Sequence, residues 1–192
     1  MWTSNTKKIY IFYTVITIIG LILGLIFLLS LTEANKEIIF LNINEWIQSI
    51  KNGHINSIIS HIIILSSLFI LSLIIIGFPI NIFLNLYNGF SIGFIIASLT
   101  TLFGVKGFLY GIIFIIITKA IYLFFSFILT ISNSKYCIIN IKSFFKTFKF
   151  NKDHFSILCQ KNLLCIGIII CYDILLYFIG SKILTIFNFL IN

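Results

Sequence analysis

Long apolar runs separated by short polar segments dominate this 192-residue chain. The longest run, from Ile62 to Val105, contains no charged side chain. Because a helix crosses the hydrocarbon core in about 20 apolar residues, this run alone is long enough for two crossings. On the first apolar segment, Gly20 and Gly24 form a GxxxG pair, a common pattern that lets helices approach closely. The pattern predicts five membrane-spanning helices in a single domain, at about 9–31, 58–78, 79–103, 107–131 and 162–180.

The central apolar run also carries residues that disfavour one continuous helix. Gly77-Phe78-Pro79 is the best turn candidate, because proline cannot continue an ordinary helix. Asn88-Gly89 is the alternative, since this dipeptide is typical of turns, and residues 93–103 would then form a short re-entrant segment. Both alternatives stay open, so we expect a helix break or tight turn within residues 77–93. A second tight turn is predicted at Gly104-Val105-Lys106-Gly107.

Two polar segments are predicted to lie on the membrane surface. Residues 32–57 place isoleucines and Trp46 at helical spacing, which favours a helix lying flat in the interface. Residues 134–161 are rich in lysine. Within them Lys142 and Lys146 share one helix face, whereas phenylalanines share another. This pattern predicts a basic amphipathic segment against an anionic leaflet.

The positions of the lysines predict the orientation in the membrane. Short basic connections stay on the cytoplasmic side, so Lys7 and Lys8 place the N-terminus inside. Five alternating spans then place residues 134–161 inside as well and the C-terminus outside, with Lys106 as an outward exception. The expected fold is therefore an all-α, multi-pass membrane protein. Its immediate partner is the lipid bilayer, and no nucleic-acid partner is expected.

The composition agrees with this fold and limits the chemistry. The chain is 60% hydrophobic and 9% charged, whereas soluble domains carry roughly 25% charged residues. It contains no Walker loop, HExxH or GxSxG motif, so neither enzymatic activity nor a catalytic residue is expected. The four cysteines are too far apart for a zinc site, and no metal or cofactor is expected. His54 and His61 are interpreted as interfacial histidines near the outer surface.

Two charged residues inside predicted spans form the candidate functional pair. Lys119 lies near the middle of the fourth span and Asp173 near the middle of the fifth. Ionisable groups at that depth are costly and suggest function, and their similar depth predicts that they pair. We favour a structural bridge between helices over a path for an ion or substrate. Similarly, the polar face of Asn81, Asn85 and Asn88 either lines a cavity or, as we favour, bonds to neighbouring helices.

An ordered set of motifs occupies the centre of the chain. A Gly-x-Pro is followed by Gly-Phe-x-x-Gly-Phe and then by Gly-x-Lys-Gly before the fourth span. In these motifs and their spacing, residues 74–122 resemble the stage II sporulation protein M family. One departure is Ile117-Thr118-Lys119, where the form found in spore-forming Firmicutes has Pro-Gln-Asn. The motif residues, which we expect to form turns and close helix contacts, are Gly77, Pro79, Asn88, Gly89, Gly93, Gly104, Lys106 and Gly107.

The resemblance implies a multi-pass protein of the bacterial cell membrane with a non-enzymatic role. Family members in spore formers act in engulfment, as the membrane scaffold for an amidase and a lytic transglycosylase that remodel septal peptidoglycan. The expected function is therefore to anchor membrane-bound peptidoglycan hydrolases during sporulation. The alternative is a small transporter or substrate-binding permease component with Lys119 and Asp173 in its pathway. A scaffold is expected to offer a groove for another helix, and a transporter a water-accessible cavity at the bilayer midplane.

Overall fold

All regular secondary structure in the computed structural model is helical, as predicted. The structure describes residues 4–51, 58–73, 77–147 and 152–187. The elements are α1 (Ser4–Ser30), α2 (Glu33–Lys51), α3 (Ile58–Ser72), α4 (Gly77–Thr118), α5 (Ala120–Thr147), α6 (Lys152–Leu175), the π-helical segment η1 (Leu176–Gly180) and α7 (Ser181–Ile186).

Within the described ranges, four helices are long and apolar enough to cross a membrane, where the sequence predicted five. The remaining apolar helix, α3, has 15 residues. At 1.5 Å per residue it is about 22 Å long, shorter than a hydrocarbon core of about 30 Å. The four candidate spans are Lys7–Ser30, Gly77–Thr118, Ala120–Ile139 and Phe155–Gly180.

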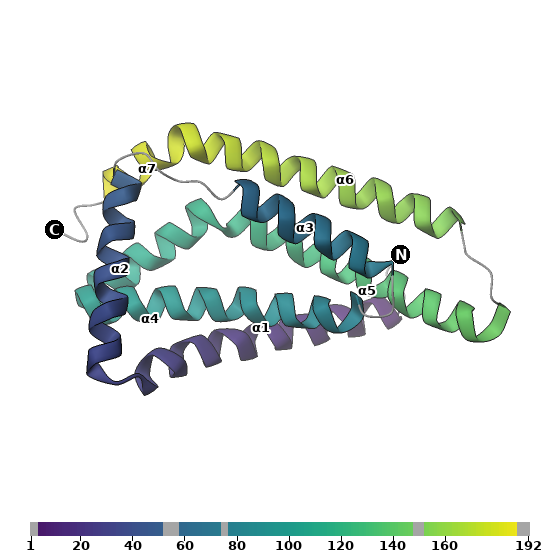
Figure 1. Ribbon diagram of the computed structural model, residues 1–192, viewed down its shortest axis with the longest axis horizontal. Helices are drawn as coiled ribbons and strands as arrows, with labels where there is room; N and C mark the ends of the chain where they lie inside the picture. The colour runs from purple at the N-terminus through teal and green to yellow at the C-terminus, as the bar shows by residue number, and fades with distance from the viewer. Residues whose placement is uncertain (1–3, 52–57, 74–76, 148–151, 188–192) are drawn as a thin grey trace.

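The 42-residue helix α4 is interrupted at Gly104, where φ is 61° and ψ is −142°. This region of backbone conformation is nearly restricted to glycine, and the chain reverses direction here (Figure 1). Three residues later, a Cβ added to Gly107 would overlap the carbonyl oxygen of Leu99, so the two arms of the turn pack closely. The predicted turn at residues 104–107 is therefore present. The part of α4 beyond it, together with the start of α5, occupies the predicted fourth span.

Residues 77–93 all belong to helix α4, so the helix break expected within this range is not observed there. Helix α3 ends at Ser72 and α4 begins at Gly77, so the predicted second and third spans belong to separate helices. Residues 74–76 lie outside the described part of the chain. Asn88-Gly89 is helical, and α4 continues from there to Gly104. The alternative turn at this dipeptide, and the re-entrant segment that depended on it, are therefore not observed.

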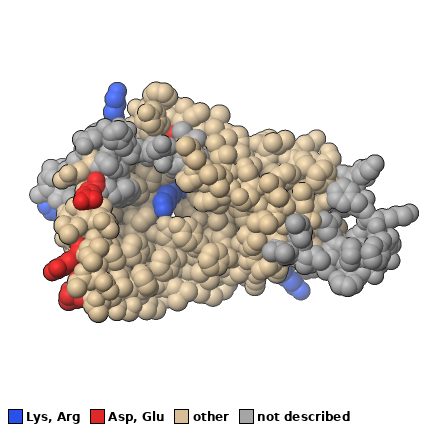
Figure 2. Space-filling view, viewed as in Figure 1, with Lys and Arg blue, Asp and Glu red and all other residues tan. Residues whose placement is uncertain are grey.

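Most helices run along the long axis of the molecule, and α2 lies across one end (Figure 1). This position fits the surface helix predicted for residues 32–57. The exposed Glu33, Glu37 and Glu45 of α2 contribute to the acidic side chains gathered at this end in Figure 2. Helix α1 starts at the opposite end, where α5 ends and α6 begins. The lysines at the start of α1 therefore share an end with residues 134–161.

The predicted basic amphipathic segment is divided between two long helices. Residues 134–147 are the last part of α5, and residues 152–161 are the first part of α6. In Figure 1, α5 projects beyond the other helices at this end. The side chains of Lys142 and Lys146 lie outside the described part, so their expected contact with lipid stays a prediction.

Helices α1 and α4 pack through two pairs of glycines. A Cβ on Gly20 or Gly24 would overlap backbone atoms of α4, and a Cβ on Gly89 or Gly93 would overlap backbone atoms of α1. The predicted GxxxG pair of α1 thus meets a second GxxxG pair on α4. Backbones that approach this closely gain dispersion contacts along both helices, the main attraction between helices in lipid.

The outward faces of the helices are largely apolar. Leu29, Phe83 and Leu163 have exposed fractions of 70%, 69% and 72%. Such faces suit contact with lipid chains, and their distribution along four long helices is compatible with a membrane protein. In the interior, asparagine, serine and threonine occupy buried positions on α4 and α5.

Candidate functional site

The asparagine face of α4 points at α5. Asn81 Nδ2 donates to Ser134 Oγ at 3.2 Å, and Asn88 Nδ2 donates to Ser126 Oγ at 3.4 Å. Between them, Asn85 Nδ2 donates to the Asn81 carbonyl oxygen at 3.1 Å, within α4 itself. All three asparagines are buried. Two of the three therefore supply hydrogen bonds between helices, as the favoured hypothesis expected.

Helix α5 is the centre of further polar contacts. It is bonded to α1, α3 and α6 by side chains that lie away from the outer faces. Because an unmade hydrogen bond is costly inside an apolar bundle, these bonds favour one arrangement of the helices. The hydroxyls of Tyr13 and Ser134 are hydrogen-bonded to each other. Cys137 Sγ donates to the Ser72 carbonyl oxygen at 3.0 Å, and Asn162 Nδ2 donates to Asn133 Oδ1 at 3.0 Å.

Lys119 lies at the junction between α4 and α5. Its Nζ donates to Ser91 Oγ of α4 at 2.7 Å. Backbone hydrogen bonds continue through the junction, where the Lys119 N–H donates to the Ile115 carbonyl oxygen at 2.9 Å. The Tyr172 hydroxyl of α6 donates to the Ile117 carbonyl nearby. Lys119 thus lies within a nearly continuous helix. It is close along the chain to Ile117, which Tyr172 of α6, the residue preceding Asp173, contacts.

Asp173 belongs to a cluster drawn from three helices. It is 1% exposed, and its Oδ2 lies 2.8 Å from Nδ1 of His61 in α3. The imidazole stacks on Tyr122 of α5, with ring centroids 3.9 Å apart and ring planes 11° apart. A carboxylate at Nδ1 fixes the orientation of the ring. The cluster therefore joins α3, α5 and α6, and places an oriented imidazole between a buried carboxyl group and a phenol.

Lys119 and Asp173 thus have different partners. The ion pair expected between them is not among the interactions of the described residues. Sequence reasoning also gave His61 no role. The sequence signal was helical spacing, since Leu65 and Leu68 follow His61 at i+4 and i+7 and so share its helix face. Both leucines are buried, and the histidine therefore lies on the inward face of α3.

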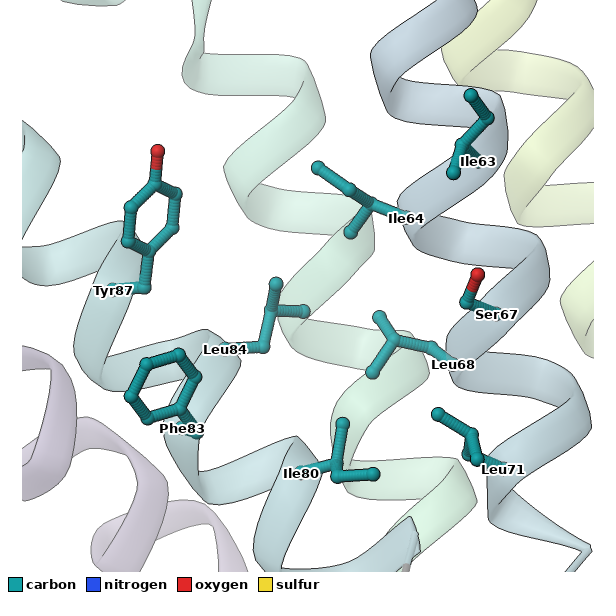
Figure 3. A pocket seen from close by; sticks show the side chains of 9 residues that line it. All are labelled: Ile63, Ile64, Ser67, Leu68, Leu71, Ile80, Phe83, Leu84 and Tyr87. Atoms are coloured by element: carbon teal, nitrogen blue, oxygen red, sulfur yellow. The ribbon is translucent and has the colours of Figure 1, made fainter.

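An apolar groove of about 350 Å³ lies between α3 and α4. Figure 3 shows side chains from the two helices facing each other across it, and only Ser67 and Tyr87 bring oxygen atoms. Ile63 and Phe83 are 60% and 69% exposed, so the groove opens to the outside of the bundle. Its lining residues are Ile63, Ile64, Ser67, Leu68, Leu71, Ile80, Phe83, Leu84 and Tyr87.

The motif residues are distributed along α4 and do not converge on one point. A Cβ on Gly77 would overlap the Leu71 carbonyl oxygen, so this glycine permits close contact with the end of α3. Pro79 lies in the first turn of α4, where proline is tolerated. Lys106 is exposed beside Gly104. The remaining motif residues, all buried, are Asn88, Gly89, Gly93 and Gly107.

Metal chemistry finds no support within the described ranges. No group of three or more histidine, cysteine or acidic side chains there could hold a metal ion. None of the four cysteines, Cys137, Cys159, Cys165 and Cys171, forms a disulfide within the described structure. No protein-family model, curated protein or solved structure matches the chain.

Proposed function

We propose that this protein is a non-enzymatic membrane scaffold that binds a transmembrane helix of a partner protein in the groove between α3 and α4. One observation carries the proposal. The groove is apolar and opens outward, whereas Lys119 and Asp173 are engaged inside the bundle. The motif resemblance supplies the partner class, which is a membrane-anchored amidase and a lytic transglycosylase acting on septal peptidoglycan during engulfment.

The shape of the groove suits a helix. Its walls are two helices, and α3 is shorter than a full crossing. Helices associate in lipid by close packing, and small residues at the contact let backbones approach. Ser67 is an exposed small residue on the α3 wall, between the larger Ile63 and Leu71. A partner helix lying there would cover the exposed Ile63 and Phe83.

The transporter alternative has less support. It requires Lys119 and Asp173 in a water-accessible path. Lys119 is bonded to Ser91, and Asp173 is 1% exposed against His61. Neither residue lines the groove between α3 and α4. Neither lines the two cavities beside Lys135 and Lys161 at the basic end of the bundle.

In the membrane, the proposal counts α3 as a fifth and shorter crossing. The end that carries Lys7, Lys8 and residues 134–161 faces the cytoplasm, because basic connections are retained there. Helix α2 and the C-terminal end then face outward. This orientation places α2 on the side of the membrane where peptidoglycan hydrolases act.

Co-purification tests the scaffold function. The tagged full chain is expressed with a candidate amidase and transglycosylase and purified in mild detergent. Ile63→Trp fills the groove, and Ile18→Trp is the matched control, since Ile18 is 51% exposed on α1. We expect Ile63→Trp to lower hydrolase recovery at least about tenfold, equivalent to a loss of about 1.4 kcal/mol, and Ile18→Trp to leave it unchanged. Failure of the unmodified chain to retain either hydrolase would contradict the proposal, as would equal recovery with both variants.

A further inference from the structure

Two adjoining cavities lie at the basic end of the bundle, the larger between α1, α5 and α6 and the smaller between α5 and α6. Their volumes are about 390 and 220 Å³, and both are lined by Ser132, Lys135 and Lys161. The larger is also lined by Tyr10, Ile128, Ile131, Gln160, Leu164 and Cys165. The smaller is also lined by Tyr136, Ile139, Ile157 and Leu158.

The lining changes from polar to apolar with depth. Helix α5 runs toward the basic end and α6 runs away from it (Figure 1). Lower numbers on α5 and higher numbers on α6 therefore lie deeper in the bundle. The shallow part of the larger cavity carries Lys135 and Lys161, and its deep part carries Ile128 and Leu164. The cavity thus places ammonium groups above an apolar floor, which the 63% exposed Leu164 leaves open to the outside of the bundle.

The two lysines have no carboxylate partner among the described residues. Lys135 is held over the ring of Tyr10, with Nζ 5.8 Å from the ring centroid, an arrangement that positions the cation without neutralising it. Two like charges beside one cavity repel each other. A bound anion would remove that repulsion and engage both side chains.

The smaller cavity contains a second, independent indication of a ligand. Tyr136 is 3% exposed, and within the described structure its hydroxyl has no hydrogen-bond partner. Its ring contacts Phe155, with centroids 6.5 Å apart, which helps to hold the side chain in place. A buried hydroxyl without a partner is unfavourable. An oxygen atom of a ligand in this cavity would accept the hydrogen bond.

We propose that these cavities bind one anionic phospholipid. Its headgroup phosphate is held by Lys135, Lys161 and the hydroxyl of Tyr136, and an acyl chain lies on the floor formed by Ile128 and Leu164. Basic pockets between transmembrane helices are suited to anionic headgroups, and the apolar floor distinguishes a lipid from a soluble phosphate. The site is separate from the groove between α3 and α4, so it does not depend on the proposed scaffold function.

Native mass spectrometry of the purified full chain tests the site. The protein is titrated with phosphatidylglycerol and, separately, with phosphatidylcholine carrying the same acyl chains. We expect preferential binding of phosphatidylglycerol. Lys135→Gln and Lys161→Gln should each weaken it about fivefold, the contribution typical of one lysine near an anionic lipid. Lys106→Gln, at the other end of the bundle, is the control and should leave binding unchanged.

Three further variants test the apolar floor and the hydroxyl, and competition with glycerol 3-phosphate separates the lipid from a free anion. Leu164→Trp fills the floor, whereas Leu163→Trp alters a neighbour that does not line the cavity. Tyr136→Phe removes only the hydroxyl. We expect Leu164→Trp and Tyr136→Phe to weaken lipid binding, Leu163→Trp to have no effect, and glycerol 3-phosphate not to displace the lipid. The proposal is overturned by equal binding of the two lipids, by an equal effect of Lys106→Gln, or by displacement with glycerol 3-phosphate.

Discussion

At the scale of single residues, the contact between His61 and Asp173 distinguishes the structure from the sequence-based expectation. A charged side chain near the middle of a membrane costs about 2.5–3.5 kcal/mol on insertion scales. The 2.8 Å contact offsets part of that cost, and it connects Asp173 to α3 instead of to Lys119. Lys119 in turn bonds to Ser91. The two charged groups therefore stabilise different pairs of helices.

A double-mutant cycle checks this assignment. His61→Leu and Asp173→Leu, singly and together, should show a coupling of about 0.5–3 kcal/mol in the free energy of unfolding, because either single change leaves the other group without this partner. The measurement is reversible unfolding in mixed detergent micelles. Lys119→Met combined with Asp173→Leu is the control and should be additive within about 0.5 kcal/mol. Stronger coupling in the control than in the His61 cycle would restore the originally predicted pair.

At the scale of helices, the crossing of α1 and α4 depends on glycines. Gly89→Leu should lower the free energy of unfolding by about 1–3 kcal/mol or more, because even its Cβ would overlap the carbonyl oxygen of Thr17 and force the helices apart. Gly167→Leu in α6 is the matched control, since no atom lies within 4 Å of a Cβ at that position. The measurement is the fraction of folded, monodisperse protein in detergent, which falls when the free energy of unfolding falls. Similar yields for both variants would argue against a tight crossing.

At the scale of the whole molecule, the proposed orientation is open to direct labelling. Asn42 in α2 and Ser156 near the start of α6 are both exposed and lie near opposite ends of the bundle. In a variant lacking the four native cysteines, a membrane-impermeant maleimide should label Asn42→Cys in intact cells, because basic connections stay inside and α2 then faces outward. Ser156→Cys should react only after permeabilisation. The opposite pattern would reverse the orientation.

The sequence alone determined the features that depend on local chemistry. Long charge-free runs require helices, because the backbone must satisfy its own hydrogen bonds in lipid. The turn at Gly104 likewise follows from the positive φ that glycine permits. The polar face of Asn81 and Asn88 was visible from helical periodicity. These inferences needed only neighbours along the chain.

Tertiary structure decided which faces meet. Asn88-Gly89 stays helical because glycine there serves the crossing with α1, a use that periodicity cannot distinguish from a turn. His61 was assigned to the surface by its position in the chain, yet its face of α3 packs inward against α5 and α6. The groove and the α5–α6 cavities also form between different helices, so periodicity along one segment does not predict them. Partner choice among helices depends on how whole surfaces pack, and that information is distributed over several segments at once.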